Sequence, residues 1–105
     1  MIFWRAKLNM DSEGFISTIE SHLVTLAPIT RFIIKKQLND LNLNRSSMTP
    51  DQAIIFIDKM TQALILCLGN DGSQLARKMM LKELRTFAPD YFEKKINALG
   101  SASTV

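Results

Sequence analysis

The stretch from Ala53 to Leu68 constrains the fold of this chain more than any other, because it is dense in Ile, Leu, Phe and Met. Thr49 stands before it as a helix cap, and Pro50 suits the first helical position. Gln52 is placed to complete a capping box with the threonine. Gly69 follows as a left-handed stop. The stretch is therefore predicted to be one helix that begins at the proline and ends before the glycine.

Apolar side chains fall on both sides of this helix when successive residues are placed about 100° apart. Its polar positions share one arc: Asp58, Lys59, Thr61 and Gln62. Four apolar residues lie beside or within that arc: Ile54, Ile55, Ile65 and Leu66. A helix that is apolar nearly all round is either central in a bundle or shared with another subunit. Because the run is shorter than a bilayer span of roughly 20 residues and contains two charges, we expect it in a soluble core and not in a membrane.

The size of the chain permits one compact domain. Its 105 residues are 47% hydrophobic and 22% charged, which is enough apolar material for a real core. The net charge of +3 allows an acidic partner without requiring one. We expect an N-terminal extension over residues 1–10, a single helical domain over 11–99 and a flexible tail over 100–105.

Helical periodicity predicts a compact all-α bundle of about five helices and no strand. Besides the central helix near residues 50–68, the expected helices cover residues 13–26, 28–42, 73–86 and 89–98. The helix that Pro28 opens has two apolar stripes, one of which contains Ile34 and Leu38. Two stripes imply two neighbours, which are other helices of the bundle or a twin subunit.

The sequence contains no recognisable catalytic, metal or cofactor motif. The single histidine, His22, borders the apolar stripe of its helix, and the single cysteine, Cys67, lies on the apolar arc of the central helix. We expect the thiol to be a buried packing group in a reducing cytoplasm. One His and one Cys far apart are too few for a zinc site, and no phosphate-binding loop occurs. An enzyme is therefore not expected, unless the fold brings His22 into a cleft beside a carboxylate or Cys67.

A basic arc on the helix near residues 73–86 supports an alternative, nucleic-acid binding. Its members are Arg77, Lys78, Lys82 and Arg85. Such a strip is able to contact phosphates, and the turn from Gly69 to Ser73 would make this the recognition helix of a helix-turn-helix. No aromatic side chains interleave with the charges to stack on bases. A solvated helix face explains the same pattern.

The phrase Leu26-Ala27-Pro28-Ile29-Thr30, followed by Arg31-Phe32-Ile33-Ile34, resembles a helix opening of the Leu-Gly-Pro-Ile-Ala type. That opening belongs to small all-helical association modules of bacterial and archaeal signalling proteins. The resemblance covers about residues 15–84, with alanine in place of the glycine and threonine in place of the final alanine. It implies a non-catalytic association module and supplies no functional residue.

The function expected from the sequence is self-association or protein partner binding by a small cytoplasmic module, as a homodimer. The central helix and the two-striped helix before it are expected to form the interface. The candidate interface residues are Ile34, Leu38, Ile54, Ile55, Ile65 and Leu66.

Overall fold

Three helices form the fold in the computed structural model, which describes residues 11–89 and 91. They are α2 (Ser12–Leu26), α3 (Thr30–Asp40) and α4 (Pro50–Phe87). No strand occurs within these described residues, so the predicted all-α class is confirmed. The expected extension over 1–10 and tail over 100–105 lie outside them, as does most of the expected helix over 89–98.

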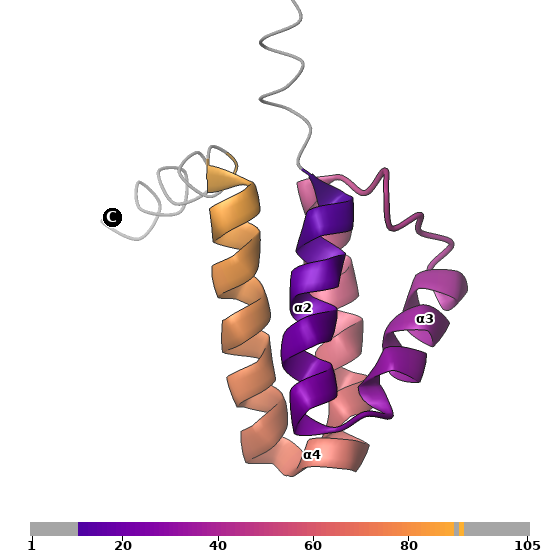
Figure 1. Cartoon of the computed structure of the whole chain (residues 1–105), viewed down its shortest axis with the longest axis vertical. Coiled ribbons are helices and arrows are strands. Elements are labelled where there is room, and N and C mark those ends of the chain that lie inside the picture. Colours follow the sequence, from indigo (N-terminus) through magenta and orange to yellow (C-terminus); the bar gives the residue numbers. More distant parts are fainter. Residues whose placement is uncertain (1–10, 90, 92–105) are drawn as a thin grey trace, which may run out of the picture.

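Within the described residues the expected count of about five helices is corrected to three, because α4 contains two of the predicted helices and most of the helix expected over 89–98 lies outside these residues. Gly69 alone inside α4 has non-helical angles, with φ 75° and ψ 178°. The turn expected over residues 69–72 is thus a single residue, and helical structure resumes immediately after it. Figure 1 shows α4 folding back on itself at this bend. We refer to residues 50–68 and 70–87 as the first and second halves of α4.

The helices run up and down in a small bundle. In Figure 1, α2 lies in front of the first half of α4, with α3 on one side and the second half of α4 on the other. The α2–α3 connection and the bend of α4 lie together at the lower end of that view, which we call the Gly69 end. At the opposite end, the Tyr91 hydroxyl donates to Asp51 Oδ1 at 2.7 Å and joins the start of α4 to the chain just after its last residue.

The core forms where the apolar stripe of α2 meets the inner faces of α3 and α4. Phe15 and Phe87 pack edge to face there with ring centroids 6.2 Å apart. The apolar stripe of α2 is buried, apart from its last member, Leu26. The largest fully buried apolar side chains are Phe15, Phe56, Ile16, Ile19, Leu23, Ile34, Ile57, Met60, Leu64, Met80 and Leu84.

The predicted capping box at the start of α4 is present. The Gln52 N–H donates to Thr49 Oγ1 at 3.3 Å, and the Thr49 N–H donates to Gln52 Oε1 at 3.0 Å. α2 is capped by Asp11, whose carboxylate accepts from the Gly14 N–H at 3.0 Å. The helix starts are thus fixed by local chemistry that the sequence contains.

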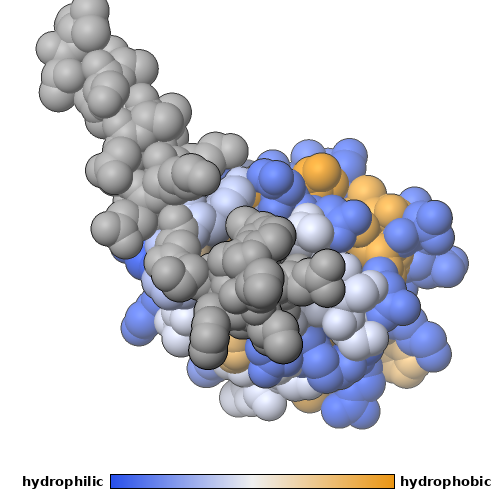
Figure 2. Space-filling model, turned by 90° about the horizontal axis from the view of Figure 1, so that it is seen from above, coloured by the Kyte–Doolittle hydropathy of each residue, from blue (hydrophilic) through white to orange (hydrophobic). Residues whose placement is uncertain are grey.

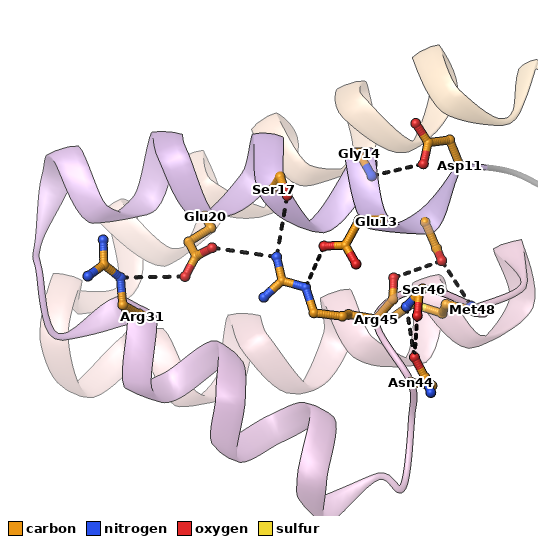
Figure 3. A network of polar contacts seen from close by, with 11 residues as sticks. Asp11, Glu13, Gly14, Ser17, Glu20, Arg31, Asn44, Arg45, Ser46 and Met48 are labelled. Atoms are coloured by element: carbon orange, nitrogen blue, oxygen red, sulfur yellow. Dashed lines mark hydrogen bonds and ion pairs between the residues drawn. The ribbon is translucent and has the colours of Figure 1, made fainter.

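A polar network joins α2, α3 and the connection that precedes α4 (Figure 3). Arg45 donates from Nε to Glu13 at 2.8 Å and from Nη2 to Ser17 Oγ at 3.4 Å. Its Nη2 also lies 3.6 Å from Glu20, which in turn lies 3.5 Å from Arg31 Nε on α3. The longest connection of the described chain is therefore held against α2, and this places the first half of α4.

α4 is the one described helix that is long and apolar enough to cross a membrane, judged by length and composition alone. The side chains of its first half that face α2 and α3 are buried in the protein core. Several on the other side are exposed, and these lead to the candidate site.

Candidate association surface

Seven large apolar side chains are exposed in the described part of the chain. The seven are Leu26, Ile29, Phe32, Ile55, Ile65, Leu66 and Leu75. Leu66 is 94% exposed, Phe32 69% and Leu75 67%. Ile55 lies on α4 about 16 Å from Leu66 along the helix axis. The other six are in the turns next to the α2–α3 connection and the Gly69 bend, and we call them the apolar end.

The connection between α2 and α3 holds three members of the apolar end in place. Thr30 is fully buried, and its hydroxyl donates to the Ala27 carbonyl at 2.7 Å. The Phe32 N–H donates to the Ile29 carbonyl at 3.0 Å. Because these bonds close the connection tightly, the side chains at the end of α2 and the start of α3 have no further helix beside them to cover them. Leu26, Ile29 and Phe32 are exposed for this reason.

The bend of α4 positions the other three members. The Ser73 side chain is fully buried, and its hydroxyl donates to the Asn70 carbonyl at 2.9 Å. A Cβ added at Gly72 would come within 2.7 Å of Leu68 Cβ, so the chain packs closely just after the bend. This packing uses Leu68 and leaves Ile65 and Leu66 on the outer side of the turn.

The apolar end contains few charges. Residues 26–34 and 62–76 include only Arg31 and Asp71. Arg31 lies 3.5 Å from Glu20. Seen from the opposite end, in Figure 2, the described surface is mainly hydrophilic with hydrophobic patches towards its edge. The Gly69 end is therefore able to be buried without enclosing a net charge.

The structure divides the six predicted interface residues into two groups. Ile55, Ile65 and Leu66 are exposed. Ile54 is half-buried against the core, and Ile34 and Leu38 are buried within it. The stripe of α3 that contains Ile34 and Leu38 is covered by the chain's own helices and by Leu41 and Leu43 of the following connection. It is therefore not available for contact with a twin.

Sequence reasoning missed four members of the apolar end: Leu26, Ile29, Phe32 and Leu75. Periodicity places all four on apolar stripes, because it counts a residue at a helix end like one in the middle. The signal available was position, because each lies within two turns of a predicted helix boundary. Near a helix end, a side chain is flanked by its own helix on one side only and is therefore more exposed.

The predicted burial of Cys67 is wrong, since this thiol is exposed. It lies in the last turn before Gly69, where the helix runs beyond the body of the bundle. His22 is also exposed, and its Nε2 lies 3.8 Å from Glu83 Oε2. Within residues 11–89 and 91, no group of three His, Cys, Asp or Glu side chains is arranged to hold a metal ion.

The basic arc is partly neutralised by acidic neighbours. Arg77 donates from Nη1 to Asp58 Oδ1 on the first half of α4 in a hydrogen-bonded ion pair. Lys78, Lys82 and Arg85 are exposed on the second half. The described residues contain nine Lys and Arg against eight Asp and Glu, so this part of the chain is nearly neutral.

Comparison with protein-family models, curated proteins and solved structures gives no match for this chain. The resemblance to small association modules of signalling proteins stays a prediction.

Proposed function

We propose that this protein is a small, non-catalytic, cytoplasmic module that forms a homodimer through its apolar end. The observation that supports the proposal is the exposure of six large apolar side chains from two separate turns at one end of the bundle. Exposed apolar groups that gather in this way mark interaction sites, whereas singly scattered ones do not.

The size of the apolar end suits a stable dimer. Fully burying a Leu, Ile or Phe side chain removes roughly 100 Å² of apolar surface from water. The six side chains are on average about two-thirds exposed, so they still offer about 400 Å² per copy. Two copies together would bury about 800 Å² of apolar surface, which at ~60% apolar content corresponds to an interface of about 1,300 Å². That total is within the range of specific interfaces.

A second copy is the partner that the charges favour. In a twofold contact the same surface of both subunits is in contact, so the charges of that surface face an identical set of charges. Arg31 and Asp71 are the charges of the Gly69 end, so this end carries no net charge. Two copies of it therefore do not repel one another. An anionic membrane or nucleic acid would find no net positive charge at this end.

The test compares substitutions at the apolar end with one elsewhere on α4. Leu66→Lys and Phe32→Glu each place a charge at the apolar end. The lysine lies near the carboxyl end of the first half of α4 and the glutamate near the start of α3, where the helix dipole favours a positive and a negative charge respectively. We expect sedimentation velocity at micromolar concentration to show a dimer for the natural chain and a folded monomer for both variants. Ile55→Glu, also at an exposed isoleucine of α4, is the control and should remain dimeric.

Circular dichroism would establish that each variant keeps its helices. A natural chain that sediments as a folded monomer would contradict the proposal. So would dimers that persist in both variants at the apolar end.

Nucleic-acid binding has less support as an alternative. The pairing of Arg77 with Asp58 removes one of four basic residues from the arc, and Glu83 lies on the same half of the helix. The salt dependence of duplex DNA affinity would reveal phosphate contacts by the basic arc, because each counterion released from the DNA makes that dependence steeper.

A further inference from the structure

We propose that the homodimer is domain-swapped: the second half of α4 packs on the twin, and Gly69 becomes part of one continuous helix. This inference rests on the proposed self-association and specifies how the two copies combine. Its source is the juxtaposition of the Gly69 bend with the apolar end.

The hinge of the hairpin is one residue long. Helical structure extends to both sides of Gly69, whose φ of 75° and ψ of 178° lie in a region that is open essentially to glycine alone. A Cβ at this position would meet no atom within 4 Å, so side-chain packing does not hold the bend itself. Short hinges favour domain swapping, and here only the backbone angles of one glycine have to change.

Contacts far from the hinge hold the second half of α4 against the rest of the bundle. They are the Arg77–Asp58 ion pair, the His22–Glu83 approach and the Phe15–Phe87 ring pair. Each joins the second half of α4 to a residue before Gly69. All three can therefore form again between copies, so swapping keeps the core and alters only the hinge.

The straight helix brings the two apolar ends face to face. Its 38 residues would extend about 57 Å, leaving one body through the Gly69 end and entering the twin through the same end. Leu66 and Leu75, both strongly exposed, lie on either side of the hinge at the junction of the bodies. Swapping thus places these side chains beside the twin, at the contact between the two bodies.

Crosslinking across the Arg77–Asp58 pair distinguishes a swapped dimer from a docked one. The variant carries Asp58→Cys and Arg77→Cys in a Cys67→Ser background, so that these are its only thiols. After treatment with a short bismaleimide, we expect the swapped form to give covalent dimers on a denaturing gel. A docked dimer or a monomer would give only internally linked single chains.

A matched pair of cysteines controls for the reach of the crosslinker. Arg45 and Glu13 also form an ion pair, at 2.8 Å, but both precede Gly69. Glu13→Cys with Arg45→Cys should therefore give linked single chains in any arrangement. Sedimentation of the double variants separates the two proposals. A dimer with only intrachain links at positions 58 and 77 overturns the swap and leaves self-association standing, whereas a monomer overturns both.

Gly69→Ala tests the hinge independently. Alanine disfavours the positive φ of the bend and favours the continuous helix. We expect this variant to dimerise at least tenfold more tightly than the natural chain. The swap is contradicted if the variant associates no more tightly, whether it stays folded as a monomer or loses its helices.

Discussion

Ser12 joins the start of α2 to the connection before α4 through one buried hydroxyl. This Oγ donates to the Arg45 carbonyl at 2.8 Å and accepts from the Met48 N–H at 3.1 Å. Ser12→Ala would leave both backbone groups without this partner, at a cost of about 1–3 kcal/mol. We expect urea denaturation to show that loss. Ser47→Ala, an exposed serine of the same connection, should change the free energy of unfolding by less than about 0.5 kcal/mol.

The role of Ser12 was not predictable from the sequence, because its hydroxyl reaches residues more than thirty positions away. Asp11 supplies the cap of α2. Local patterns describe neighbours within a turn of helix, whereas this contact depends on where the connection returns to α2. The same holds for Arg45 and its three partners on α2.

The start of α4 is the element boundary that the sequence specified best, and it supports a second prediction. Thr49→Ala removes the hydroxyl that accepts from the Gln52 N–H and so opens the capping box. We expect the free energy of unfolding to fall by about 1 kcal/mol in thermal or urea denaturation.

Thr25→Ala is the matched control for that prediction. Thr25 is exposed near the end of α2, and its hydroxyl donates to the Ser21 carbonyl within the same helix. Because alanine is the better helix former, this change should cost no stability. An equal loss from both variants would contradict the role assigned to the capping box.

Among the elements, helix type and helix faces were more predictable than helix number. The stripe of α2 and the excess of apolar residues on the first half of α4 follow from periodicity, and Ile55, Ile65 and Leu66 are exposed accordingly. The expected second interface stripe failed because Ile34 and Leu38 are covered by helices of the same chain. Periodicity identifies an apolar face without identifying its neighbour.

At the scale of the whole molecule, the candidate site arises from topology. Its residues come from two turns that are far apart in the sequence, and the up-and-down arrangement places both turns at one end. No periodicity or motif in the sequence indicates which helix ends will meet. Only the first half of α4, with Ile65 and Leu66, drew attention to this end beforehand.

Self-association also predicts that the stability of the natural chain depends on its concentration. When folding and dimerisation are coupled, each tenfold rise in protein concentration stabilises the dimer by about 1.4 kcal/mol relative to unfolded chains. For a dimer of this size the midpoint of thermal unfolding should rise by roughly 4 °C per tenfold step. The Leu66→Lys variant, as a folded monomer, should unfold at one temperature throughout. If the thermal unfolding midpoint of the natural chain is also independent of concentration, self-association is contradicted. Burial within one chain would then be sufficient for folding, despite the 94% exposure of Leu66.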